Sequence, residues 1–183
     1  MSLTLKNITF GEFLNLTDDE AYPYIFAFRH GRTLIKPINH YNLKPLIEFS
    51  FGRVKDGMYL LEKGVTMADV PMFLAIYHWK DESFWLNIGV VEVLQFFAYV
   101  KKELETLMEV ERKRLVRALS SKEIMAGIEK FSEFGYLPQA KVLAQLNFQS
   151  IDWVLKQPYG QMLNELCLNA VENDYQIAYS RLK

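Results

Sequence analysis

The sequence has little of what most metal and redox sites need. It contains one cysteine, Cys167, and three histidines, His30, His40 and His78. A single cysteine excludes a disulfide or a thiolate metal cluster within one chain. The histidines are isolated from one another, and none forms the i, i+4 pair that binds zinc from one helix. We therefore expect no metal ion and no other cofactor.

Long apolar runs and an excess of one charge are also lacking. No stretch approaches the roughly 18 uninterrupted apolar residues of a transmembrane helix, and no basic start followed by an apolar run opens the chain. The 21 basic and 22 acidic residues give a formal net charge of −1, which provides no global attraction to nucleic acid or to an anionic membrane. These features favour a soluble cytoplasmic protein that binds no membrane.

Phosphate-binding loops are missing as well. The nine glycines form neither a G-x-x-x-x-G-K-[ST] string nor a G-x-G-x-x-G string. No complete catalytic constellation appears anywhere in the sequence. The chain is therefore predicted not to be an enzyme.

Apolar and aromatic residues are plentiful. Half of the 183 residues are hydrophobic, and 13 Phe, 10 Tyr and 3 Trp are among them. A chain of this length can bury roughly 70% of the surface that it exposes when unfolded. We expect a single helical domain over residues 1–183; if the chain forms two lobes, the hinge is expected near residues 80–87.

Helix-start and helix-stop signals recur along the chain. Thr9, Thr17 and Ser120 each precede a glutamate by three residues, which is the spacing of a capping box. Gly64 and Gly135 stand where a helix would end. The pattern predicts a mainly α protein, an irregular multi-helix bundle. Its helices are expected near residues 10–15, 18–29, 45–63, 67–79, 88–118, 121–134, 138–146, 150–156 and 159–181.

The segment over residues 88–118 is expected to be one long central helix. Val93, Phe97, Val100 and Leu104 recur at steps of three and four residues, the period of one helix face. After these positions the sequence turns to alternating charge. We expect the first half of this helix to be buried and the second half to be solvated.

One segment fits two kinds of structure. Aromatic residues at every second position from Tyr22 to Phe28 suit a strand, and Pro23 argues against an unbroken helix. The spacing suits a helix face equally well. A short strand pair near residues 22–36 therefore remains an alternative to the helix at 18–29.

The string Arg29-His30-Gly31 resembles the RHG motif of the histidine phosphatase family. The resemblance would make His30 the phosphoryl acceptor and Arg29 a phosphate ligand on an α/β sandwich. That family also needs a second histidine late in the chain, and this sequence has none after His78. A helix end capped by Gly31 explains the string as well, because cations favour the negative end of a helix. A phosphatase-like enzyme stays an alternative.

Basic residues gather on the second part of the long helix. Lys101, Arg112, Arg114 and Arg117 are candidate phosphate contacts, so a nucleic-acid-binding regulator that uses residues 101–117 is a further alternative. Glutamates interleave with these residues, which favours a solvated, ion-paired helix face. Binding of nucleic acid is therefore not the leading expectation.

Aromatic residues mark two candidate docking faces for a partner protein. One is the segment Trp79–Phe97, which includes Trp85 and Phe96, and the other is the final helix with Tyr159, Leu163, Leu166 and Ala170. Aromatic side chains often anchor protein interfaces. The same side chains fit a protein core equally well, so the sequence leaves both interpretations open.

The C-terminal two-thirds of the chain resembles small structural proteins of tailed bacteriophages, including the tail assembly chaperones. The segments that carry this resemblance are Phe97–Val100 running into the Glu103–Glu111 helix, Ser121–Glu129, Phe134-Gly135 and Asp152–Tyr159. The resemblance implies a non-enzymatic protein that binds other structural or assembly proteins, or copies of itself, through its helices. It also implies a place in the host cytoplasm or in the virion, and it assigns no role to any single residue.

Overall fold

A computed structural model describes residues 7–30, 44–77, 80–115, 124–125, 127–180 and 182. The chain divides into two compact units. Unit 1 contains residues 1–43 and 60–103, and unit 2 contains residues 44–59 and 104–183. The boundaries at 59–60 and 103–104 fall inside helices, so two helices contribute residues to both units. Residues 80–87, the expected hinge, lie within unit 1.

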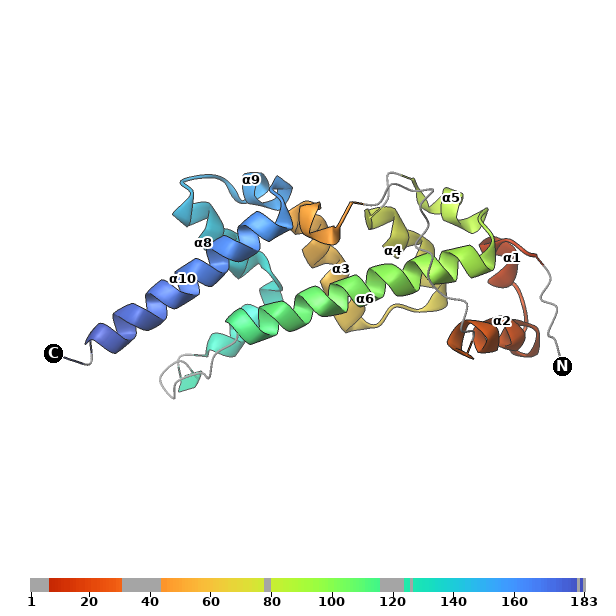
Figure 1. Cartoon of the computed structure of the whole chain (residues 1–183), viewed down its shortest axis with the longest axis horizontal. Coiled ribbons are helices and arrows are strands. Elements are labelled where there is room, and N and C mark those ends of the chain that lie inside the picture. The colour runs from red at the N-terminus through yellow and green to blue at the C-terminus, as the bar shows by residue number, and fades with distance from the viewer. Residues whose placement is uncertain are drawn as a thin grey trace. The chain divides into compact units, whose positions relative to one another are not determined.

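Unit 1 is built from short helices and one half of a long helix (Figure 1). The short ones are α1 (Phe10–Phe13), α2 (Asp18–His30), the 3-10 helix η3 (Met67–Asp69), α4 (Val70–Tyr77) and α5 (Glu82–Leu86). The first half of α6 (Val90–Leu115) and the last turn of α3 (Phe51–Lys63) complete the unit. Helix α5 packs against both α1 and α4.

Hydrogen bonds join the start of unit 1 to the start of α6. The Phe10 amide donates to the Ile88 carbonyl at 2.7 Å, and the Val90 amide donates to the Ile8 carbonyl at 3.0 Å. The Thr9 amide and hydroxyl both donate to the Glu12 carboxylate, and these bonds lower the pKa of that carboxyl group. The Glu12 amide in turn donates to the Thr9 hydroxyl oxygen, which completes the capping box predicted at this position.

Unit 2 is built around the N-terminal part of α3 and the C-terminal part of α6. Its remaining described helices are η2 (Leu46–Glu48), η4 (Ile128–Phe134), α8 (Leu137–Leu146), α9 (Ile151–Lys156) and α10 (Tyr159–Ser180). Helices η2 and η4 are 3-10 helices. Helix α8 packs against both α9 and α10, as Figure 1 shows for the blue end of the chain.

Two glycines let segments of unit 2 approach closely. A Cβ atom on Gly52 in α3 would lie 3.2 Å from the Leu155 carbonyl oxygen of α9. A Cβ atom on Gly160 in α10 would lie 2.5 Å from Ile47 Cγ1 and 3.3 Å from the Ile47 carbonyl oxygen. Gly160 therefore allows η2 to lie against the first turn of α10, and Gly52 allows α3 to approach α9.

Replacing Gly160 with alanine is expected to lower the free energy of unfolding by about 1–3 kcal/mol, the usual cost of overpacking. Thermal or urea unfolding measures this loss. The double variant Gly160→Ala/Ile47→Ala is the control, because it removes the Ile47 atoms that the new methyl group meets most closely. It should recover part of the loss. A Gly160→Ala variant as stable as the wild type would contradict the close approach.

The expectation of a mainly α fold with one long central helix is confirmed, because α6 spans 26 residues. Most predicted helices appear with small changes at their ends. The segment predicted as one helix over 45–63 is two, because the chain is extended at Phe49 and Ser50 forms an isolated bridge with Pro158. Part of the helix predicted at 121–134 is the 3-10 helix η4, and α5 was missed.

The alternative of a strand near residues 22–36 is wrong for its described part. Residues 22–30 belong to α2, which continues through Pro23. The described residues contain no strand, only the isolated bridges Thr9–Gly89 and Ser50–Pro158. Residues 31–43, which include the remainder of that alternative, lie outside the described part.

Among the described helices, none combines the length and the apolar composition that crossing a bilayer requires.

Candidate functional site

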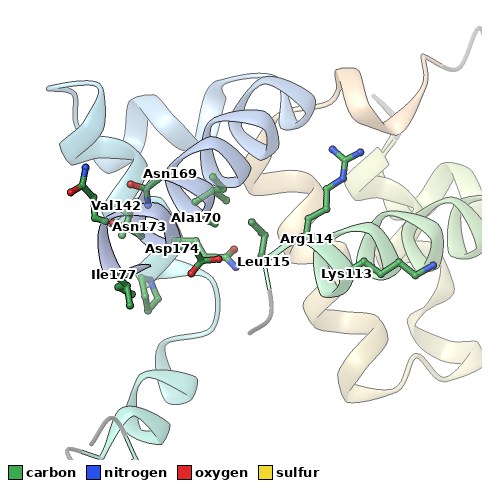
Figure 2. Close-up of a pocket in the computed structure, with 13 residues that line it drawn as sticks. Lys113, Arg114, Leu115, Val142, Asn169, Ala170, Asn173, Asp174 and Ile177 are labelled. Atoms are coloured by element: carbon green, nitrogen blue, oxygen red, sulfur yellow. The ribbon is translucent and has the colours of Figure 1, made fainter. Parts of the chain in front are cut away.

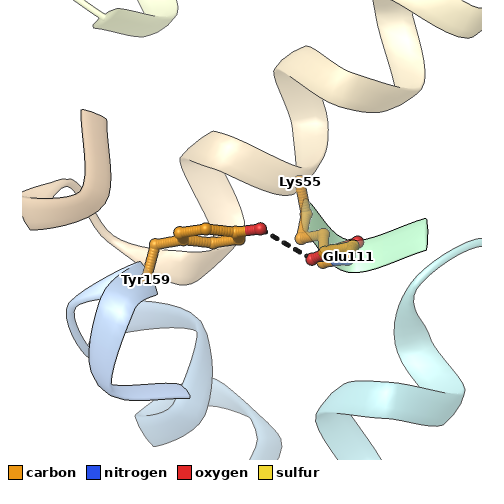
Figure 3. A network of polar contacts seen from close by, with 3 residues as sticks. All are labelled: Lys55, Glu111 and Tyr159. Atoms are coloured by element: carbon orange, nitrogen blue, oxygen red, sulfur yellow. Dashed lines mark hydrogen bonds and ion pairs between the residues drawn. The ribbon is translucent and has the colours of Figure 1, made fainter. Parts of the chain in front are cut away.

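The first turn of α10 is fixed inside unit 2 by a buried tyrosine. The Tyr159 side chain is fully buried, and its ring stacks on Phe51 with centroids 6.1 Å apart. Its hydroxyl group donates a 2.8 Å hydrogen bond to the Glu111 carboxylate of α6 (Figure 3). Burial, followed by the negative charge of Glu111, raises the pKa of Tyr159, so the hydroxyl group keeps its proton at neutral pH.

Lys55 of α3 completes this polar network. Its Nζ atom lies 2.6 Å and 2.7 Å from the two carboxylate oxygens of Glu111. The Lys55 and Glu111 side chains are only 6% and 15% exposed. A buried ion pair of this kind is costly to break, because the remaining charge is left in a poorly solvated place. The network therefore joins α3, α6 and α10 at one point inside unit 2.

The second half of α10 has a different environment from the first. Met162, Leu163 and Leu166 are buried in unit 2, whereas every residue from 171 to 180 is exposed. Helix formation is unfavourable for ten isolated residues and becomes favourable mainly through packing. This half of the helix continues from a packed first half but buries little surface of its own.

Large apolar side chains line one face of this exposed half. Leu168, Val171, Tyr175 and Tyr179 follow one another at steps of three, four and four residues, so they form one stripe along the helix. We call these four residues the outer stripe. Their exposed fractions are 60%, 66%, 61% and 48%. The rings of Tyr175 and Tyr179 stack with centroids 6.0 Å apart.

The opposite face of α10 lines a cleft of about 700 Å³ within unit 2 (Figure 2). Leu166, Ala170 and Ile177 contribute apolar surface from α10, and Val142 contributes apolar surface from α8. Figure 2 shows Leu115, at the end of α6, on the side of the cleft across from α10. Helix α10 therefore presents apolar side chains on two opposite faces, one toward the cleft and one with exposed side chains.

The polar lining of the cleft combines carboxamides with charged side chains. Gln139 of α8 and Asn169, Asn173 and Gln176 of α10 line it, together with Lys113 and Arg114 of α6 and Asp174 of α10. The Gln139 Oε1 atom is buried and accepts no hydrogen bond from the described residues. The carboxamides can donate and accept hydrogen bonds. The two cations and the carboxylate add charges of both signs to the same cleft.

Three of the predicted docking side chains are part of the core. Trp85, Phe96 and Tyr159 are at most 1% exposed. Trp85 stacks on Phe96 at 5.0 Å inside unit 1, and Tyr159 stacks on Phe51 inside unit 2. Of the two interpretations that the sequence left open, the core is correct for these three residues, because their rings are not on the surface. Trp79 lies outside the described residues.

The predicted basic residues are on the surface. Lys101, Arg112 and Arg114 are exposed, and Arg117 lies outside the described part. Glu109 forms ion pairs with Arg112 and with Lys113, and the hydrogen bond from Lys113 is the main reason that the pKa of Glu109 is lowered. The glutamates thus neutralise part of the basic charge, as their spacing predicted.

The string that resembles the phosphatase motif lies at the end of a helix. Arg29 and His30 are the last residues of α2, and Gly31 lies outside the described part. The residues before them, Tyr24–Phe28, are helical and not the strand that the phosphatase resemblance implies. Within the part of the chain that is described, no group of three or more His, Cys, Asp or Glu side chains could hold a metal ion.

Comparisons of the chain with models of protein families, with curated proteins and with solved structures found no match.

The sequence pattern did not identify the outer stripe as a candidate site. Its residues were included in one helix, and the pattern put the docking face of that helix at Tyr159, Leu163, Leu166 and Ala170. The first three of these are buried, and Ala170 lines the cleft. The sequence signal that could have revealed the outer stripe is a second apolar stripe on the opposite side of the same helix. A helix that buries a single face needs only one apolar stripe.

Proposed function

We propose that the protein is a non-enzymatic structural or assembly protein that acts by binding other proteins through its helices. The outer stripe of α10 carries this proposal. Surface apolar residues that occur singly need no explanation, but a continuous stripe at helical spacing is typical of a docking surface. The resemblance of the C-terminal two-thirds to structural and assembly proteins of tailed bacteriophages supports partners of that kind.

Burial of the outer stripe against a partner would supply the affinity. A tyrosine ring buries about 150–250 Å² when it is fully covered, so Tyr175 and Tyr179, which are 61% and 48% exposed, each leave about 100 Å² to cover. At about 25 cal/mol per Å², each ring contributes roughly 2.5 kcal/mol before the costs of association. Because association itself costs free energy, a stable complex needs several such residues from each protein. The four residues of the outer stripe would therefore need a matching apolar face on the partner.

Replacing Val171 with glutamate is expected to abolish recovery of the partner with an affinity-tagged chain from cells that naturally make it. A charge on the outer stripe would have to be desolvated in the complex. The folded chain should be unaffected, because Val171 is 66% exposed and surface substitutions usually change stability by less than about 0.5 kcal/mol.

Tyr22→Glu provides the matched control. Tyr22 is 61% exposed, as is Tyr175, and it lies next to a second aromatic ring on its own helix, Phe26 of α2, at a centroid distance of 5.9 Å. Partner proteins should be recovered with this variant as with the wild type. The proposed role of α10 would be contradicted if partner proteins were still recovered with Val171→Glu. It would also be contradicted if their recovery were lost equally with Tyr22→Glu.

A further inference from the structure

We propose that the outer stripe of α10 binds an amphipathic helix of a partner protein whose apolar face is flanked by lysine and arginine. This inference rests on the proposed function and adds the chemistry of the partner. Its basis is the charge that surrounds the stripe.

Helix α10 carries acidic residues and no basic ones. Glu165, Glu172 and Asp174 are its only charged residues between Tyr159 and Ser180, and Arg181 and Lys183 come later in the sequence. Glu165 is already engaged, because it accepts hydrogen bonds from Asn147 and Gln161. Glu172 and Asp174 are exposed, and within the described residues they form no ion pair.

The two exposed carboxylates lie on opposite sides of the outer stripe. Glu172 follows Leu168 by four residues and precedes Tyr175 by three, so it borders one edge. Asp174 follows Val171 by three residues and lies beyond the other edge, between the stripe and the cleft, which it also lines. An apolar stripe with a carboxylate on each side complements an apolar stripe with a cation on each side.

The spacing of the stripe selects a helix as the partner. Steps of three, four and four residues are those of a helix-packing seam, in which side chains of one helix fit between those of another. A second α10 matches this spacing, but it would bring Glu172 and Asp174 near the same carboxylates of the other copy. Nucleic acid is disfavoured for the same reason, because its phosphates carry the same charge as these side chains.

Two synthetic peptides test the inference on the full chain. Both are 18-residue amphipathic helices with leucine at the seam positions; one has lysine at the flanking positions and the other has glutamate. Fluorescence anisotropy of each labelled peptide is followed with up to about 1 mM protein, in 50 mM and in 500 mM NaCl. Sedimentation of the protein alone over the same concentrations measures self-association.

We expect the lysine-flanked peptide to bind roughly fivefold more tightly than the glutamate-flanked peptide in 50 mM NaCl, given two exposed ion pairs. The difference should shrink in 500 mM NaCl because of screening. Glu172→Lys should reduce or reverse the preference, and Tyr175→Ala should weaken binding of both peptides. The matched control Tyr22→Ala should bind both as the wild type does.

Three outcomes would overturn the inference. The first is equal binding of the two peptides, which would leave α10 a protein-binding helix without the proposed charge preference. The second is no binding of either peptide. The third is a dimer that forms in sedimentation and is lost with Val171→Glu, which would make a second copy the occupant. The proposed function is tested separately by the recovery of partner proteins, so the two failures are distinguishable.

Discussion

The Trp85→Ala variant is expected to lose about 4 kcal/mol of unfolding free energy, within the usual range for a large aromatic residue in a core. Trp85 is fully buried in unit 1. Its ring stacks on Phe96 and makes an edge-to-face contact with Phe84, in which the ring centroids are 5.2 Å apart. Removing the indole leaves a cavity between α5 and α6 that the surrounding side chains fill only in part. Urea unfolding followed by circular dichroism measures the loss.

The neighbouring Phe84 provides the control for this prediction. It stands beside Trp85 on α5 but is only partly buried. Phe84→Ala should therefore cost clearly less than Trp85→Ala. A Trp85→Ala variant that loses less than about 1 kcal/mol, a cost typical of surface positions, would contradict the burial of this ring and would restore it as a candidate docking residue.

The Lys55→Met variant is expected to lose about 3 kcal/mol of unfolding free energy. Methionine keeps the length of the side chain but leaves the Glu111 carboxylate, which is 15% exposed, without its cation. Breaking a buried ion pair from one side typically costs 3–5 kcal/mol, and the small exposure of Glu111 favours the lower end of this range. Chemical unfolding at pH 7 tests the prediction.

The double variant Lys55→Met/Glu111→Gln separates the charge from the packing. Glutamine has no charge to leave unpaired, and its carbonyl oxygen can still accept the hydrogen bond from Tyr159. Most of the lost stability should return. Lys63→Met, at an exposed position on the same helix, should change stability by less than about 0.5 kcal/mol. A double variant no more stable than Lys55→Met would contradict the role assigned to the buried charge.

Local signals in the sequence were sufficient to predict much of the secondary structure. The Thr9 capping box and the stop at Gly64, with its φ of +92°, both depend on residues at most four positions apart. Such signals determine where a helix begins and ends. They do not determine which of its faces is buried.

Contacts between distant parts of the chain could not be predicted in this way. Lys55 and Glu111 are 56 residues apart, and in the sequence Glu111 only interrupts the apolar pattern of the long helix. In the same way, the apolar pattern of the final helix predicted a docking face at its first turns. Packing in unit 2 buries those turns and leaves the outer stripe exposed, so the candidate site became visible only once the fold was known.

The most direct test of the role of α10 is photo-crosslinking from position 175 in cells that naturally make the protein. A photoreactive phenylalanine analogue replaces Tyr175 in one variant and Tyr22 in another, and mass spectrometry identifies the adducts. We predict a discrete protein adduct from position 175 and none of comparable yield from position 22. No protein adduct from position 175, or the same adducts from both positions, would contradict a protein-binding role for the outer stripe.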